Sequence, residues 1–302
     1  MGVDLWIALG FVAAISGLAF WAGRRLSLSV YRDRPFLFLE CLALSLVFAF
    51  GVVGNLTWAH AFPTSAVICW SNWMPIFLAF TAGLATEMSA LRERSRKFAT
   101  VFFLMIAAGF LMLPVSRPYL SPIQLSDSDH WQDGVCLQSN SASCGPAAVA
   151  TLLRLQGVLE RTSRMARRDT GSQQESRSSE ATFARLCLTS NEGTSTLGLF
   201  RGIEMGLQGT GMEARIADHS IRLWESKNQL PNVAVVQFEP VQSPGLIRGL
   251  LRNDGEKHAI VVHSRADDGT WLVADPAVGW RSWEDDALRA AFTGEAIYIG
   301  RK

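Results

Sequence analysis

The apolar residues of this chain are concentrated in its first third. Four runs there approach the roughly 20 residues that a helix needs to cross a bilayer, at positions 5–22, 35–53, 66–85 and 99–115. Only the second run holds a charged residue, Glu40. Repeated runs of this length are typical of membrane proteins rather than of buried core helices. The sequence therefore predicts a membrane domain of four transmembrane helices over residues 1–115.

The charges between these runs predict the topology. Residues 54–65, between the second and third runs, contain no arginine or lysine. Basic side chains gather instead after the first run and after the third: Arg24, Arg25, Arg32, Arg34, Arg92, Arg94, Arg96 and Lys97. Because positive loops stay in the cytoplasm, both termini are expected on the far side of the bilayer. The prediction is an integral protein of a bacterial inner membrane with an extracytoplasmic C-terminal domain.

Beyond residue 115 the pattern changes to that of a soluble protein. Residues 116–133 are punctuated by serine and proline and predict a linker. Helical patterns come first in the domain at 134–302, and short apolar runs typical of strands follow. This order indicates an α+β fold. Helices are expected at 144–156, 181–188, 196–207 and 283–292, a weak helix or turn at 245–251, and strands at 212–217, 232–238, 258–263, 271–274 and 296–299. The polar segment 161–179 predicts an exposed, mobile insertion.

Charge and motifs argue against nucleic acid, an ATP-binding domain and zinc. The formal net charge of the 302 residues is +1, which argues against nucleic acid. The chain contains no GxxxxGK[ST] phosphate loop and therefore no ATP-binding domain of that kind. It also lacks a CxxC pair, which argues against zinc. The expected partners are a peptide or protein substrate and the lipid bilayer.

One cysteine stands where a helix is expected to begin. Cys144 is followed by Gly145 and Pro146 and then by the helical run, and Gln138 precedes it by six positions. A helix N-terminus carries partial positive charge, which favours the nucleophilic thiolate. The amide of Gln138 and the backbone N–H of Cys144 are positioned to stabilise an oxyanion. Cys144 is a candidate nucleophile, with a buried structural thiol as the alternative.

A candidate base and its orienting group lie far downstream. His258 opens one expected strand and Asp275 closes the next, with the Asp268-Gly269 hairpin signal between them. Antiparallel pairing would bring imidazole and carboxylate together. His263 is the alternative to His258. Asp267 and Asp268 are the alternatives to Asp275, although aspartates that flank a turn are most simply turn formers.

These elements resemble the double-glycine-leader, or bacteriocin-processing, cysteine peptidases, which are papain-like. The resemblance covers about residues 134–300 and rests on Gln138, Cys144-Gly-Pro-Ala147, His258-Ala-Ile-Val-Val262, Asp275-Pro276 and Glu192-Gly-Thr-Ser195. It implies a papain-like cysteine peptidase domain after the membrane helices, with Cys144 as nucleophile, His258 as base, Asp275 as orienter and Gln138 in the oxyanion hole. No cofactor is implied. Many relatives carry an acidic residue before the cysteine, where this chain has Ser143, and many are fused to an ATP-driven exporter.

Two other functions use the same residues. An acyltransferase or amidase would share the first half-reaction, and a catalytically silent domain would only bind peptides. The membrane-anchored peptidase, with leader-peptide processing as its expected role, is the reading that all four site residues favour. Outside the cytoplasm, Cys136 and Cys187 are further expected to form a disulfide.

Overall fold

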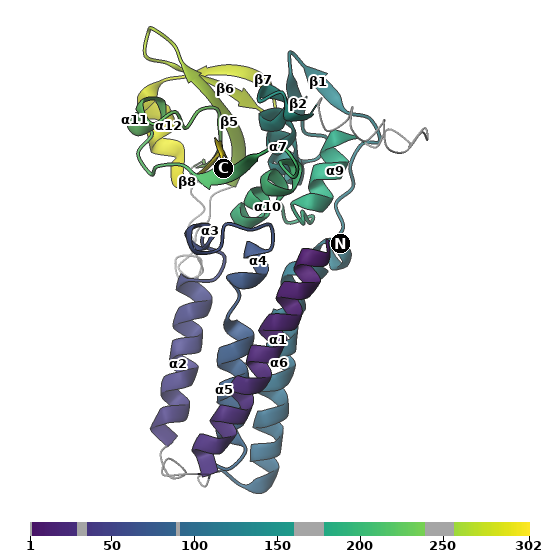
Figure 1. Ribbon diagram of the computed structural model, residues 1–302, viewed down its shortest axis with the longest axis vertical. Helices are drawn as coiled ribbons and strands as arrows, with labels where there is room; N and C mark the ends of the chain where they lie inside the picture. Colours follow the sequence, from purple (N-terminus) through teal and green to yellow (C-terminus); the bar gives the residue numbers. More distant parts are fainter. Residues whose placement is uncertain (1, 29–34, 89–90, 160–177, 239–256) are drawn as a thin grey trace, which may run out of the picture. The chain divides into compact units, whose positions relative to one another are not determined.

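The computed structural model describes residues 2–28, 35–88, 91–159, 178–238 and 257–302. The chain divides into two compact units (Figure 1). The first comprises Met1–Trp58 and Ser65–Arg117, and the second Ala59–Thr64 and Pro118–Lys302. The expected helix or turn at 245–251 and nearly all of the expected insertion at 161–179 lie outside the described residues.

The first unit is helical, as its apolar runs predict. Its helices are α1 (Val3–Leu28), α2 (Pro35–Gly51), α4 (Val67–Trp70), α5 (Met74–Ala85) and most of α6 (Glu93–Leu120). The short α3 (Trp58–Ala61) begins at the last residue of the segment Met1–Trp58, and its other residues belong to the second unit. Among the described residues, three helical segments are long and apolar enough to cross a membrane: α1, α6 and the segment Val67–Ala85 that contains α4 and α5. The remaining expected span, at 35–53, forms α2, which has 17 residues and is shorter than those three segments.

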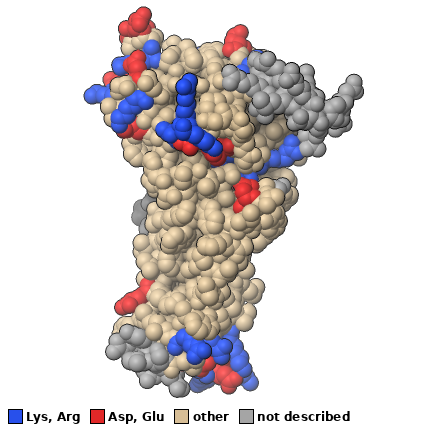
Figure 2. All heavy atoms as spheres, viewed as in Figure 1, with Lys and Arg blue, Asp and Glu red and all other residues tan. Residues whose placement is uncertain are grey.

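Close packing of α1 on α5 depends on two glycines. A Cβ added at Gly23 would overlap the carbonyl oxygen of Phe80, and one added at Gly83 would overlap that of Phe20. Small residues that let two backbones approach are typical of helix pairs in membranes. Figure 2 shows Lys and Arg side chains gathered at the end of this unit where α1 ends and α6 begins. This is the charge distribution expected of a cytoplasmic end.

The second unit contains a six-stranded antiparallel sheet in the order β3-β8-β4-β5-β6-β7 (Figure 1). Its strands are β3 (Met212–Ile216), β4 (Asn232–Gln237), β5 (Lys257–Arg265), β6 (Trp271–Asp275), β7 (Gly279–Trp283) and β8 (Phe292–Arg301). The helices are α7 (Cys144–Leu155), α9 (Ser179–Leu186), α10 (Thr196–Gly206), α11 (Arg222–Ser226) and α12 (Asp285–Ala291), with the 3-10 turn η1 (Ser141–Ser143) before α7. Helices and strands therefore lie close to where the sequence predicts an α+β domain.

Apolar side chains on one side of the sheet form a continuous core. Trp224 of α11, Trp271 of β6 and Leu288 of α12 are almost completely buried together with Ile260 and Val262 of β5. Burying such large side chains contributes about 1.5–3 kcal/mol each. The core therefore holds β5 and β6, the strands that carry His258 and Asp275, in one fixed register.

The linker expected at 116–133 is partly ordered. Helix α6 continues to Leu120, and β1 (His130–Gln132) pairs with β2 (Val135–Leu137) as a two-stranded hairpin. The turn is Asp133-Gly134, and both residues have positive φ. Asp-Gly is a strong hairpin signal, and the predicted boundary cut through it. Strand β7 is also unpredicted, because its exposed Arg281 and Ser282 hide the apolar pattern of an edge strand.

Candidate active site

Cys144 is the first residue of α7, as predicted. Its thiol is half-buried, at the end of a helix whose next nine residues are buried. Pro146 lies in the first turn, where the missing N–H costs nothing. Four N–H groups at a helix N-terminus have no partner within the helix. The backbone thus places the Cys144 side chain at the N-terminal, positive end of the α7 dipole.

Gly145 allows α7 to lie against the start of α10. A Cβ at this position would come within 2.8 Å of Leu199 Cδ2 and Thr194 Oγ1. Thr194 belongs to the Glu192–Ser195 element, and its hydroxyl lies 2.7 Å from that of Thr189. This element therefore supports the backbone next to Cys144.

Pairing of β5 with β6 brings His258 and Asp275 together. The strands are antiparallel, with Val261 opposite Ala274. His258 Nε2 lies 2.7 Å from Asp275 Oδ1, and the two side chains are only 14% and 12% exposed. The same carboxylate oxygen accepts a hydrogen bond from the Ala277 N–H at 2.8 Å. Two donors therefore hold the carboxylate in place.

Cys144 also acts on His258, since its side chain contributes to the raised pKa of the imidazole. Because Asp275 occupies Nε2, Nδ1 is the ring nitrogen left for the sulfur. Burial of the ring opposes its positive charge, but the hydrogen bonds and charges of Asp275 and Cys144 outweigh burial and raise the pKa of His258 to about 9. The pKa of Asp275 is lowered: its burial acts to raise the pKa, but the hydrogen bonds from His258 and Ala277 and the positive charges of His258 and Arg281 outweigh it. The three groups form a chain of thiol, imidazole and carboxylate.

Gln138 is joined to the same end of the sheet. Its backbone N–H donates to the carbonyl oxygen of Pro276, next to Asp275, at 2.8 Å. Its side-chain Oε1 is buried and has no hydrogen-bond partner among the residues that the structure describes.

Local hydrogen bonds shape the loop between Gln138 and Cys144. Asn140 and Ser143 form a capping box: the Asn140 side chain accepts from the Ala142 N–H at 2.9 Å, and the Ser143 hydroxyl accepts from the Asn140 N–H at 3.1 Å. Ser143 is completely buried. Ser143 therefore fixes the turn that leads into α7, at the position before the cysteine where the resemblance would favour an acidic residue.

Sequence reasoning missed one contributor to this loop. Glu180 of α9 is 1% exposed, and its carboxylate accepts hydrogen bonds from the Ser139 N–H at 2.8 Å and the Ser139 hydroxyl at 2.7 Å. Asp129 accepts from the N–H groups of Ser179 and Glu180 and so caps α9. No local spacing could reveal this clamp, because Ser139 and Glu180 are 41 positions apart.

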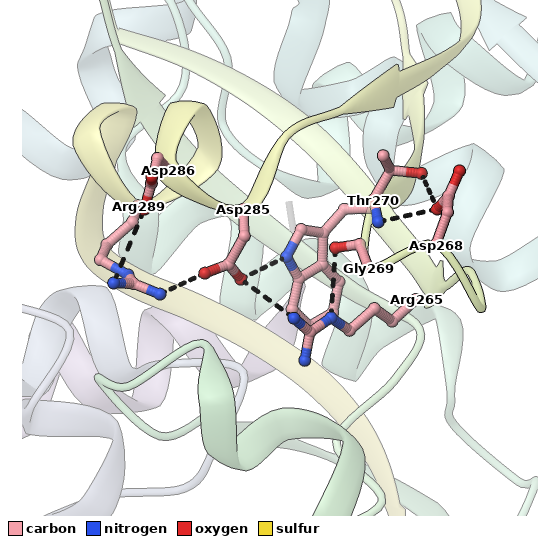
Figure 3. A network of polar contacts seen from close by, with 8 residues as sticks. Arg265, Asp268, Gly269, Thr270, Asp285, Asp286 and Arg289 are labelled. Atoms are coloured by element: carbon pink, nitrogen blue, oxygen red, sulfur yellow. Dashed lines mark hydrogen bonds and ion pairs between the residues drawn. The ribbon is translucent and has the colours of Figure 1, made fainter.

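The alternative site residues have other environments. His263 packs its ring against Trp280, with ring centroids 5.5 Å apart. Asp268 accepts hydrogen bonds from the N–H and hydroxyl of Thr270 at 2.9 and 2.8 Å (Figure 3). Asp268 is therefore the turn former that the sequence predicts. Asp285, labelled in the same figure, accepts a hydrogen bond from Trp271 Nε1 at 3.0 Å and so joins α12 to the β5–β6 hairpin.

The expected disulfide between Cys136 and Cys187 is not formed, and all five cysteines are free thiols. Cys136 packs on α7, where its N–H donates to Thr151 Oγ1 at 2.9 Å. Cys187 ends α9 and packs on Gly202 of α10. Each cysteine thus faces a different helix. Burial raises the pKa of both thiols, that of Cys187 to about 12.

A thiol at a helix N-terminus, an imidazole and a carboxylate are the groups that an activated cysteine nucleophile would require. No family model matches the sequence. It is 27% identical to an uncharacterized protein of Methanothermobacter marburgensis over 165 residues, which are 55% of this chain and 87% of that protein.

Two solved structures are similar to the chain. One is the peptidase domain of Streptococcus ComA, a bi-functional ABC transporter, with 18% identity, a TM-score of 0.35, and coverage of 55% of this chain and 96% of that one. The other is a double glycine motif protease from an AMS/PCAT transporter in complex with the leader peptide, with 15% identity, a TM-score of 0.35, and coverage of 59% and 96%.

Proposed function

We propose that this chain is a membrane-anchored cysteine peptidase. The observation that carries the proposal is the His258–Asp275 pair, with 2.7 Å between His258 Nε2 and Asp275 Oδ1, together with Cys144, whose side chain acts on the same imidazole. A cysteine nucleophile needs a base within hydrogen-bond reach and a third group that orients the base. This site supplies both.

In the proposed first step the Cys144 thiolate attacks the carbonyl carbon of a peptide bond. The α7 N-terminus and the protonated His258 stabilise the thiolate. Negative charge then develops on the carbonyl oxygen. The backbone N–H of Cys144 and the side-chain amide of Gln138 are the proposed donors to this oxyanion.

His258 then protonates the nitrogen of the leaving amine, and the C–N bond breaks to leave an acyl-enzyme. Asp275 keeps the imidazole in the required orientation and stabilises its charged form. Water, deprotonated by the now neutral His258, attacks the thioester and releases the acid. The cycle needs no group beyond these side chains and water.

The proposed substrate is a peptide segment, and the sequence resemblance favours a double-glycine leader. The proposed location is the extracytoplasmic side of the membrane, because the arginine-rich loops lie at the opposite ends of the expected spans. Four spans, with α2 as the shortest, would place both termini there.

The test is the pH dependence of Cys144 alkylation by iodoacetamide, measured by mass spectrometry in the full-length protein. Wild type is expected to react well below the ~8.5 midpoint of a free thiol, and His258→Ala should return the midpoint to about 8.5. His219→Ala is the matched control, since His219 is exposed and bonds Gly294 instead. Equal midpoints in wild type and His258→Ala would overturn the proposal.

A further inference from the structure

An apolar pocket of about 560 Å³ lies in the second unit. It is lined by residues from the end of β4, from the junction of β7 with α12, and from α12 itself: Gln237, Phe238, Ser282, Trp283, Glu284, Ala287, Ala290 and Ala291. Two aromatic rings and three alanines provide most of its surface. The volume is within the range of about 300–1,000 Å³ that is usual for ligand sites.

Phe238 connects this pocket to the proposed catalytic base. Its ring centroid lies 6.2 Å from that of His258 and 6.1 Å from that of Trp283. Phe238 is also 47% exposed, so part of its ring is open to solvent. An exposed phenylalanine in contact with a catalytic imidazole is well placed to touch substrate.

The chemistry of the proposed reaction decides which part of a substrate lies beside His258 and Phe238. The carbonyl oxygen of the scissile bond must face Gln138 and the Cys144 N–H, whereas the leaving nitrogen must reach His258. The residues attached to that nitrogen therefore lie on the His258 side, which Phe238 borders.

We propose that the pocket binds an apolar side chain of the leaving segment, the part of the substrate C-terminal to the scissile bond. This inference rests on the proposed function and adds the side of the bond at which specificity is exerted. Ala287, Ala290 and Ala291 present one small-residue face of α12, which leaves room for a branched or aromatic side chain between Phe238 and Trp283. Glu284 at the edge disfavours acidic side chains by repulsion.

The experiment digests a synthetic peptide library with the full-length protein in detergent micelles, and mass spectrometry identifies both residues of each cleaved bond and their neighbours. Wild type is expected to favour Leu, Ile, Met or Phe over Gly and Asp among the first residues after the bond. Ala290→Trp and Ala287→Trp, which fill the pocket, should reduce the ratio of apolar to glycine peptides by about 10-fold or more. Ala266→Trp is the matched control, because Ala266 is an exposed alanine of the β5–β6 turn that does not line the pocket.

Alkylation of Cys144 by iodoacetamide in each variant tests whether the catalytic groups remain intact. The inference alone is overturned if peptides are cleaved with an apolar preference confined to the N-terminal side of the bond. It is equally overturned if Ala290→Trp and Ala266→Trp show the same preference as wild type. If wild type cleaves no peptide, both the inference and the proposed function are overturned.

Discussion

The proposed nucleophile and the proposed base are held by two different kinds of structure within the second unit. Cys144 lies in the helical part, where hydrogen bonds and close backbone contacts fix the start of α7. His258 and Asp275 lie on the sheet, where strand pairing places two side chains side by side. The position of Cys144 thus depends on close backbone packing around α7. The positions of His258 and Asp275 depend on the register of β5 and β6.

This difference predicts where each part is sensitive. The register of β5 and β6 is set by a buried apolar core, so the polar side chains at their ends can change without moving the strands. Substitutions there should affect chemistry and spare the fold. At the start of α7 even one added methyl group meets neighbouring atoms, so substitutions there should affect the fold or the precision of the site.

The largest effect is expected on the sheet side. Asp275→Ala should lower kcat/KM by about 10²–10⁴-fold, because His258 loses both its orientation and the charge that stabilises its protonated form. Asp275→Asn should lose less, since the amide oxygen still accepts the Nε2–H. Asp267→Ala, an exposed aspartate of the β5–β6 turn, is the control. Steady-state kinetics with a peptide substrate measure the difference, and equal losses in Asp275→Asn and Asp275→Ala would contradict this account of orientation.

The second effect is a shift in pH dependence. Because the pKa of His258 is raised from 6.5 to about 9, the protonated imidazole and the stability it contributes are fully present below about 6.5 and are lost as the pH rises through about 9. The alkaline limb of kcat/KM should therefore lie near pH 9. It should move to lower pH in Asp275→Asn, which removes the negative charge. A limb that stays in place would show that Asp275 does not control this titration.

Parts of this comparison could be predicted from the sequence. The approach of His258 to Asp275 follows from two apolar runs joined by Asp268-Gly269, and α7 follows from the helical run after Cys144, Gly145 and Pro146. Both features can be predicted because the residues that determine them lie close together in the sequence. The clamp of Glu180 on Ser139 and the contact of Phe238 with His258 could not be predicted, because they depend on how distant elements pack. The expected disulfide is wrong, since Cys136 and Cys187 are both free and buried: Cys136 lies on β2, and Cys187 follows α9 and packs on Gly202 of α10.

A smaller effect is expected in the helical part when the clamp is weakened. In Glu180→Gln one of the two donors of Ser139 faces an amide nitrogen, so the loop that carries Gln138 loses a fixed position. We expect kcat to fall roughly 10-fold with little change in KM. The pH midpoint of Cys144 alkylation should stay unchanged, because the thiol and imidazole are untouched. Glu225→Gln on α11 is the exposed control, and a shifted midpoint in Glu180→Gln would contradict a role limited to the loop.

The smallest effect concerns the backbone fit itself. Gly145→Ala adds a methyl group against Thr194 and Leu199, and overpacking of this kind destabilises a core by about 1–3 kcal/mol. Gly300→Ala meets only the side chain of Arg215, which is flexible and can move aside. Hydrogen exchange of α7 in the full-length protein should therefore accelerate in Gly145→Ala and remain at the wild-type rate in Gly300→Ala. Equal exchange in both variants would mean that α7 tolerates displacement at its N-terminus. The contrast between a register-controlled base and a backbone-controlled nucleophile would then fail, even with the catalytic chemistry intact.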